Sequence, residues 1–364
     1  MTDDPFVTHR SLLFTVAYEM LGSAADADDV VQETWLRWAA VDRAEVRHPR
    51  AYLVQIVTRQ ALNRLRTVAR RREEYVGEWL PEPLLTSPDV AEDVEFAESV
   101  SIAMLTVLET LAPSERAVFV LREVFDLPYA DIAAALDKTP AAVRQIAHRA
   151  REHVAARRPR IQVDRAEQQR VVDRFLVALR SGDLQVLFDV LAPDVVLIAD
   201  GGGEVAAVRR PVVGRDRVAT LLSRFTTLAP DAVLGTAWLN GAPAARIDLA
   251  GELDTAVSLV VADGRITRIY AIRNPHKLAR LDEEATLSRC PPPLPTRPGG
   301  PGQRQWSGGS HAPERCFSRI AGARRQLSAI RRRCTHASSA EARDRRREAP
   351  EAHPRTLCRA PRRA

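Results

Sequence analysis

The stretch Asp28-Asp-Val-Val-Gln-Glu-Thr-Trp-Leu-Arg-Trp38 decides the fold of the N-terminal part of this chain. Its apolar residues recur at the spacing of one helical face, through Val30, Val31, Trp35 and Trp38. Acidic residues crowd the first turns, where carboxylates accept hydrogen bonds from free N–H groups and complement the helix dipole. The stretch therefore predicts an amphipathic helix with an acidic start, within a helical block that covers about residues 6–75.

The charge reverses directly after this helix. Between Val46 and Arg72 the chain has eight arginines and no acidic residue, on a segment whose apolar residues again recur at helical spacing. A helix with one apolar face and a basic remainder suits a phosphate backbone. The same pattern is also typical of a solvated or membrane-surface helix. The arginines are Arg47, Arg50, Arg59, Arg64, Arg66, Arg70, Arg71 and Arg72.

A second helical block, at about residues 98–158, contains a predicted helix-turn-helix. Two short helices meet at Asp137 to Thr139, where Thr139 suits the N-cap of the second helix and Pro140 its first position. Such a second helix presents polar side chains that suit base edges in the major groove. They are Arg144, Gln145, His148 and Arg149. Taken alone, the pattern also fits an ordinary helical hairpin with a solvated polar face.

From about residue 165 the pattern changes to helices followed by strands. The dipeptides Asn240-Gly241 and Asp263-Gly264 lie between β-branched runs and predict hairpins. Helices followed by an antiparallel sheet predict an α+β domain. Four residues could carry proton-transfer chemistry, but their setting is above all typical of turns, so we predict no catalytic residue and no cofactor. They are Asp200, Asp248, Asp254 and His276.

These motifs together resemble the sigma-70-type factors of the extracytoplasmic-function group. The resemblance implies two all-α domains, the first binding core RNA polymerase and the second binding promoter DNA through the helix-turn-helix at the minus-thirty-five element. It also implies that the basic helix binds the minus-ten element, and we expect the loop from Val41 to Pro49 to help capture an unstacked base. The implied polymerase-binding residues are Asp28, Asp29, Gln32, Glu33 and Trp35; the DNA-binding residues are Arg59, Arg64, Arg66, Arg70, Arg144, Gln145, His148 and Arg149.

The linker and the segment up to about residue 280 resemble one subgroup of that family, in which a cone-shaped SnoaL-like extension regulates the factor in cis through its linker. The linker motif is Trp79-Leu80-Pro81-Glu82-Pro83, and the extension motifs are Asp200-Gly201-Gly202-Gly203-Glu204 and Asn274-Pro275-His276-Lys277-Leu278. Two positions depart from the subgroup, since Glu204 stands where it has a lysine and His276 where it has an acid. We expect Glu204 to repel any acidic partner of that lysine and so to weaken regulation.

Composition indicates the cellular compartment in which the protein is expected. All four cysteines lie at Cys290 or later, which fits a reducing compartment, and they lack paired zinc spacing, so no metal is expected. Residues 290–364 hold 17 arginines and 5 acids, a net charge of +12 that leaves −6 for residues 1–289. With no signal peptide and no apolar run that spans a bilayer, we expect a cytoplasmic protein without a membrane partner.

The sequence thus predicts a multidomain sigma factor that is not an enzyme. Its domains are 1–75 (region 2), 76–97 (linker), 98–158 (region 4), 163–284 (SnoaL-like α+β domain) and 285–364 (disordered Pro/Arg-rich tail). The expected partners are core RNA polymerase, promoter DNA and, in the C-terminal cone, an unidentified small ligand. Two alternatives stay open: a helix-turn-helix regulator that senses such a ligand without joining polymerase, and a ketosteroid-isomerase-like enzyme with an appended DNA-binding region.

Overall fold

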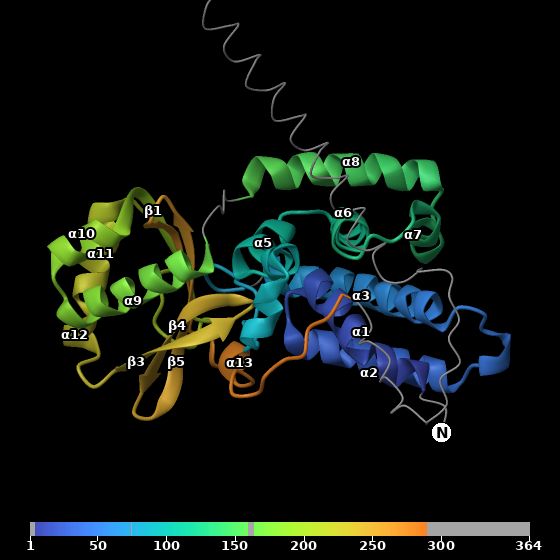
Figure 1. The fold of residues 1–364 in the computed structure, drawn as a ribbon, viewed down its shortest axis with the longest axis horizontal. Coiled ribbons are helices and arrows are strands. Elements are labelled where there is room, and N and C mark those ends of the chain that lie inside the picture. Colours follow the sequence, from blue (N-terminus) through green and yellow to red (C-terminus); the bar gives the residue numbers. More distant parts are fainter. Residues whose placement is uncertain (1–3, 74, 159–163, 290–364) are drawn as a thin grey trace, which may run out of the picture. The chain divides into compact units, whose positions relative to one another are not determined.

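The computed structural model describes residues 4–73, 75–158 and 164–289 (Figure 1). These residues belong to the first of two compact units, Met1–Leu294, whereas the second, Pro295–Ala364, lies outside the described residues. Most of the predicted tail therefore lies outside them too. The described chain extends to Arg289, a few residues beyond the start predicted for the tail.

The N-terminal block is a bundle of three helices. Asp4 accepts a hydrogen bond from the Phe6 amide at the start of the first helix, and Gly22 in the left-handed region ends it at φ 67°. The apolar stripes predicted from the sequence form one core, with Leu13, Val57 and Trp38 almost fully buried. The elements are α1 (Pro5–Leu21), α2 (Ala24–Ala39), η1 (Arg43–Glu45) and α3 (Pro49–Glu73).

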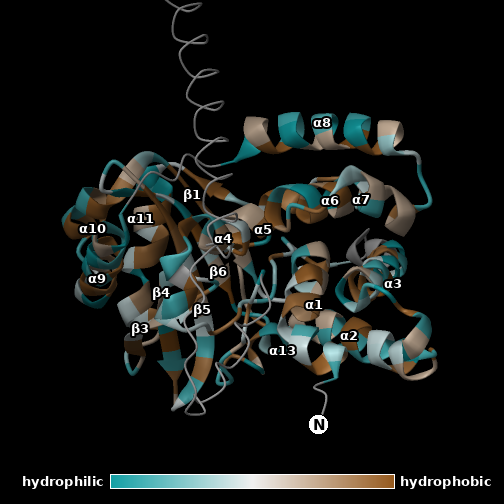
Figure 2. Cartoon of the chain, turned by 45° about the vertical axis from the view of Figure 1, so that its right-hand side comes forward, coloured by the Kyte–Doolittle hydropathy of each residue, from teal (hydrophilic) through white to brown (hydrophobic). Residues whose placement is uncertain are grey.

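The second helical block ends in the helix-turn-helix. Asp137 closes the first helix of the pair in the left-handed region at φ 52°, and Thr139 accepts a hydrogen bond from the Ala142 amide to cap the second. The predicted hinge is thereby confirmed. In Figure 2 the second helix, α8, carries alternating hydrophilic and hydrophobic bands, as an amphipathic helix does. The elements are η2 (Pro88–Glu92), α4 (Val94–Ser99), α5 (Ile102–Leu108), α6 (Pro113–Phe119), the π-helical turn η3 (Val120–Val124), α7 (Tyr129–Leu136) and α8 (Pro140–Arg157).

The C-terminal domain is α+β, with one six-stranded sheet in the order β2-β1-β6-β5-β4-β3. The expectation of a wholly antiparallel sheet was wrong in one respect: β1 pairs with β6 in parallel, because the chain returns to β1 only after the β3–β4–β5–β6 meander. Its elements are α9 (Arg165–Ser181), α10 (Leu184–Val190), β1 (Leu191–Asp200), β2 (Val212–Val213), α11 (Arg215–Ser223), α12 (Phe225–Leu228), β3 (Val233–Leu239), β4 (Ala242–Leu249), β5 (Glu252–Ala262), β6 (Arg265–Ile272) and α13 (Pro275–Leu278).

Both faces of this sheet are covered. On one face α9, α10 and α11 pack around Phe175, Leu197 and Leu259 (Figure 1). On the other face Tyr270 and Ile272 pack with Leu80 of the linker and with Ile102 of α5. Residues on successive positions of a strand point to opposite faces, so β5 and β6 supply both cores. The second core joins the sheet to the segments that precede and begin the second helical block.

Candidate functional site

The acidic helix α2 presents an exposed face. Asp29, Gln32 and Glu33 are exposed, and Trp35 is half-buried with its ring centroid 5.0 Å from that of Phe6. Leu36, which is 64% exposed, adds an apolar side chain to this part of the helix. Sequence reasoning missed Leu36, although its position off the buried stripe was a usable signal. An exposed face that mixes carboxylates with Trp and Leu suits a protein partner.

Asp28 on the same helix has two arginine partners. Arg10 of α1 lies 3.5 Å from its carboxylate. Arg280, directly after α13 of the C-terminal domain, lies 2.5 Å from the other carboxylate oxygen. A residue assigned to polymerase binding is therefore also a contact of the C-terminal domain.

The predicted DNA-binding arginines of α3 have different surroundings. Arg64 donates to Asp26 at 2.7 Å and to Asp29 at 3.1 Å, so it joins α3 to α2, and the Asp26 hydrogen bond raises the pKa of Arg64. Arg66 is exposed and contacts Asn63, and the side chain of Arg70 lies outside the described residues. Arg59 donates to the main-chain oxygens of Ala135 and Ala134 on α7.

Arg59 also pairs with Asp137 at 3.0 Å, at the hinge of the helix-turn-helix. Gln55, one turn earlier on α3, donates to the Ala134 oxygen at 3.1 Å. The carbonyl groups at the end of a helix lack partners within the helix, and these α3 side chains supply them. The basic helix thus packs on the first helix of the helix-turn-helix.

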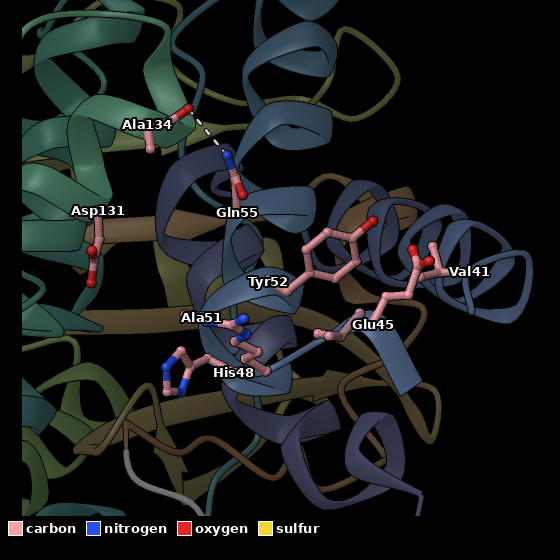
Figure 3. Close-up of a pocket in the computed structure, with 10 residues that line it drawn as sticks. Val41, Glu45, His48, Ala51, Tyr52, Gln55, Asp131 and Ala134 are labelled. Atoms are coloured by element: carbon pink, nitrogen blue, oxygen red, sulfur yellow. Dashed lines mark hydrogen bonds between the residues drawn. The ribbon is translucent and has the colours of Figure 1, made fainter. Parts of the chain in front are cut away.

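A cavity of about 470 Å³ lies beside this contact (Figure 3). One wall comes from the loop before α3 and from α3 itself, with Arg47, His48, Tyr52 and Gln55, and another from α7, with Asp131 and Ala134. Its size is that of small-ligand pockets. An aromatic ring beside amide, imidazole and guanidinium groups offers stacking and hydrogen bonding to a nucleobase.

The second helix of the helix-turn-helix, α8, carries the four predicted DNA-binding side chains on its exposed surface. The Arg144 guanidinium lies 5.5 Å from the centroid of the Tyr129 ring. Arg149 is 3.4 Å from Glu115, and His148 is 3.7 Å from Glu152. Gln145 is exposed beside them, so the helix displays Arg and Gln at its N-terminal half, where such helices contact base edges.

The linker motif and both C-terminal motifs meet in one buried cluster. The fully buried Asp200 accepts hydrogen bonds from the Lys277 ammonium at 2.6 Å and from the Leu80 amide at 2.9 Å. The Lys277 ammonium also donates to the Leu80 oxygen and lies 4.0 Å from the centroid of the Trp79 ring. We name Tyr75, Trp79, Leu80, Asp200, Gly202, Asn274 and Lys277 the linker cluster.

Tyr75 is the member that sequence reasoning missed. Its hydroxyl donates to Asp200 at 2.5 Å and accepts from the Asn274 amide at 2.8 Å. Burial, followed by the hydrogen bond to Asp200, raises the pKa of the Tyr75 phenol. Gly202 donates its amide to Asp200 at 3.0 Å, with φ 67° and no room for a side chain, since a Cβ would lie 2.6 Å from the Asn274 amide nitrogen. These contacts explain the glycine in the motif.

Glu82 connects the same linker to the N-terminal bundle. Its carboxylate accepts hydrogen bonds from the Ala24 amide at 2.7 Å and from Ser23 at 3.1 Å, at the start of α2. Its own amide donates to the Gly22 oxygen at 2.8 Å. Burial raises the pKa of the Glu82 carboxyl. Pro81, Pro83 and Leu84 are buried as well, so the linker is a packed element.

The two departures from the subgroup motifs lie against each other. The His276 imidazole is 2.8 Å from the Glu204 carboxylate. Glu204 therefore has a basic partner in its own domain. Since the subgroup lysine and acid are replaced by an acid and a base, the change at one position complements the change at the other.

Exchanging these two residues should reveal their coupling. We expect Glu204→Lys alone to lower the free energy of unfolding slightly, and Glu204→Lys with His276→Asp to restore it, with a coupling energy of about 0.2–1 kcal/mol because the pair is exposed. Urea denaturation of the wild type, Glu204→Lys, His276→Asp and the double variant measures the coupling energy, and additive effects of the two substitutions would contradict the pairing.

A second buried polar cluster joins the two helical blocks. Arg116 of α6, fully buried, donates to the Glu19 main-chain oxygen at 3.0 Å and pairs with Glu109. The Glu19 carboxyl accepts from Ser99 at 3.0 Å. Burial raises the pKa of Glu19 to about 8, against the opposing effects of Ser99 and the charge of Arg116.

Ionisation of Glu19 should therefore weaken the folded protein. The folded state holds its proton well above the ordinary carboxyl pKa of 4.5, so the stabilisation present at low pH is lost as the pH rises through about 8. Between pH 6 and pH 9 the free energy of unfolding should fall by roughly 2–3 kcal/mol more in the wild type than in Glu19→Gln. Urea denaturation across this range measures the difference. Parallel pH profiles for the two proteins would refute the assignment.

The acidic residues considered for catalysis have structural partners. Asp248 pairs with Arg246 at 2.8 Å, and Asp254 pairs with Arg273 at 2.9 Å. Asp200 belongs to the linker cluster and His276 to the pair with Glu204. Within the described ranges, no group of three His, Cys, Asp or Glu side chains could hold a metal ion. No helix in the same part of the chain is long and apolar enough to cross a membrane.

Comparison with known families agrees with this arrangement. Residues 6–72 match sigma-70 region 2, and residues 101–154 match sigma-70, region 4. The first match covers the bundle with the acidic and basic helices, and the second covers the helix-turn-helix block. Fold and motifs thus define a protein of the sigma-70 class.

Individual relatives indicate the group within the sigma-70 class to which the chain is similar. The chain is 36% identical over 286 residues to the ECF RNA polymerase sigma factor SigJ of Mycobacterium tuberculosis, covering 75% of this chain and 91% of the relative. It is 32% identical over 280 residues to the probable ECF sigma factor SigI of the same species, covering 76% and 94%. The crystal structure of Mycobacterium tuberculosis SigJ matches with a TM-score of 0.61 at 33% identity, over 74% of this chain and 95% of that one.

The chain belongs to the extracytoplasmic-function RNA polymerase sigma factors. It is a sigma factor that directs transcription initiation, with helical sigma domains followed by a sheet-containing C-terminal domain.

Proposed function

We propose that this sigma factor is regulated in cis by its C-terminal domain, which binds the linker between the two promoter-reading blocks. The observation that carries the proposal is the linker cluster. There Asp200 and Lys277, from both C-terminal motifs, hold the main chain of Leu80, and Lys277 lies against the Trp79 ring. The C-terminal domain holds the linker at Leu80, and the N-terminal bundle holds it at Glu82. A linker that is held at both places restricts how far the two helical blocks can separate.

The proposed polymerase-binding surface is the exposed face of α2, formed by Asp28, Asp29, Gln32, Glu33 and Trp35, with Leu36 added. The Arg280–Asp28 contact supports a competition at this surface, because polymerase and Arg280 would share one carboxylate. Exposed charge contacts are individually weak, so we assign this pair a modest effect.

The proposed promoter-reading surfaces are α3 for the minus-ten element and α8 for the minus-thirty-five element. Arg59, Arg66 and Arg70 are assigned to the first, whereas the position of Arg64 between Asp26 and Asp29 supports a role in holding α3 to α2. The 470 Å³ cavity beside the Val41–Pro49 loop fits an unstacked base, with the Tyr52 ring for stacking.

The remaining assignments follow from this function. We propose domain limits near residues 75, 97, 158 and 284, no enzymatic activity and a cytoplasmic location, where polymerase and promoter DNA are found. The paired carboxylates of the C-terminal domain support a structural role for them. The proposal that this domain binds a small ligand is supported by the resemblance alone. Between its helices and its sheet, side chains such as Phe175 and Leu259 pack against each other.

Removing the C-terminal domain tests the proposal. A chain ending at Arg158 should still bind core RNA polymerase but initiate at a rate different from that of the full-length protein, because the linker is released. Run-off transcription from one promoter, with core binding scored alongside, measures both. Identical transcription from the two proteins would contradict regulation in cis. Retained core binding would show that the shorter chain is folded.

A further inference from the structure

The turn between β3 and β4 is buried, although its sequence is that of an ordinary hairpin. Asn240 and Gly241 have φ values of 52° and 72°, as the Asn-Gly dipeptide of a tight hairpin requires. Hairpin tips generally lie in solvent. Asn240, however, is 1% exposed. The tip reaches the point where the N-terminal bundle, the linker and the second helical block meet.

The Asn240 side chain bonds to all three of these parts. Its amide nitrogen donates to the Tyr18 hydroxyl of α1 at 2.7 Å and to the Val100 oxygen, between α4 and α5, at 2.8 Å. Its amide oxygen accepts from the Leu84 amide of the linker at 2.9 Å. One amide group thus uses two donors and an acceptor, which no other side chain of this size offers in that geometry.

The surrounding contacts fix the tip in place. The Asn240 main-chain amide donates to the Leu84 oxygen at 2.9 Å, and the Tyr18 hydroxyl donates a hydrogen bond to the Glu82 main-chain oxygen at 2.7 Å. A Cβ on Gly241 would lie 3.0 Å from Ala97 of α4. The turn therefore fits a preformed site and could not shift without breaking buried hydrogen bonds.

The two promoter-reading blocks are in contact in this arrangement. Arg59 of α3 is held by α7, and Arg116 of α6 is held by Glu19 of α1. A minus-ten and a minus-thirty-five element lie about 25 base pairs apart, roughly 85 Å along the duplex at 3.4 Å per base pair. Blocks that read both elements must therefore separate.

We propose that Asn240 is the positioning residue through which the C-terminal domain keeps the two blocks closed. It deepens the proposed regulation in cis and rests on it for its effect on transcription. Replacing Asn240 removes the side-chain bonds that tie α1, the linker and the start of α5 to one hairpin. The main-chain bonds of the hairpin to the linker, the linker cluster and the α3–α7 and Arg116 contacts remain, so the closed arrangement is weakened.

Distances between the blocks in the full-length protein test this proposal. Cys290, Cys316, Cys334 and Cys358 are replaced by serine, and spin labels are placed at Val7→Cys on α1 and Ala155→Cys on α8, both at exposed positions. Asn240→Gly keeps the backbone turn and removes every side-chain bond. Asn240→Asp keeps the acceptor and removes both donors. Asp263→Gly changes the equivalent residue of the β5–β6 hairpin, also at positive φ, and serves as the matched control.

We expect both Asn240 variants to raise the ratio of open to closed molecules about five- to thirtyfold, as expected for the loss of buried hydrogen bonds, and Asp263→Gly to leave it unchanged. Circular dichroism and thermal unfolding show whether each variant folds. If one of the two Asn240 variants fails to fold, the distances in the other variant test the proposal. Distance distributions that match those of Asp263→Gly would overturn the proposal. The spin-label distances are measured without polymerase. If the Asn240 variants separate the two blocks but no form of the protein supports transcription, this inference is upheld and the proposed function fails.

Discussion

Replacing Lys277 by methionine should lower the free energy of unfolding by about 3–5 kcal/mol, as expected when one partner of a buried ion pair is removed. Asp200 is fully buried, and the Lys277 ammonium lies 2.6 Å from it. Methionine keeps much of the side-chain length but leaves the carboxylate in the interior without this cation. The same change removes the hydrogen bond to the Leu80 oxygen, so the linker should also become sensitive to protease.

Urea denaturation of the full-length protein measures the first effect, and limited proteolysis of residues 75–86 measures the second. Lys138→Met, at an exposed lysine in the helix-turn-helix hinge, is the matched control and should change stability little. Adding Asp200→Asn to Lys277→Met should recover part of the loss, because the buried charge is then gone. A loss below about 1 kcal/mol would mean that Asp200 is adequately held by Tyr75, Gly202 and Leu80 alone.

Replacing Arg144 by alanine should weaken recognition of the minus-thirty-five element by about 1–3 kcal/mol, or about 5- to 150-fold in affinity. Arg144 is exposed near the N-terminal end of α8, where a recognition helix approaches base edges. Its guanidinium lies over the Tyr129 ring, which orients the side chain.

Binding of the reconstituted holoenzyme to promoter duplexes that carry intact or scrambled minus-thirty-five elements measures this effect. The intact duplex should lose most of its advantage with Arg144→Ala. Arg157→Ala, at the other end of the same helix, is the control and should weaken both duplexes equally if it contacts phosphate. An unchanged preference for the intact duplex would show that another part of α8 reads the bases.

The local elements of the fold were predictable because their signals lie within a few residues of each other. The acidic start and apolar stripe of α2, the hinge at Asp137 and the hairpin at Asn240-Gly241 each depend on neighbours in the sequence. The parallel pairing of β1 with β6 was not predictable, because it joins segments about 70 residues apart whose strand patterns fit either direction.

The partners of the functional side chains were the least predictable part. Arg64 looks like any other arginine of α3, and only the packing of α2 sets it between Asp26 and Asp29. Tyr75 and Asn240 bond to residues more than 120 positions away, which no local pattern encodes. The pairing of Glu204 with His276 was likewise hidden, although both departures were visible. A substitution that seems unfavourable in a motif can be complemented by a second one in a distant motif.

Run-off transcription by purified core RNA polymerase most directly tests whether the chain is a sigma factor that is regulated in cis. The full-length chain is compared with its Asn240→Gly and Lys277→Met variants, on a promoter selected by the wild-type holoenzyme. Regulation in cis predicts specific initiation that depends on the chain and a changed initiation rate when either contact is removed. Absence of both core binding and initiation, or initiation rates that neither substitution alters, would contradict it.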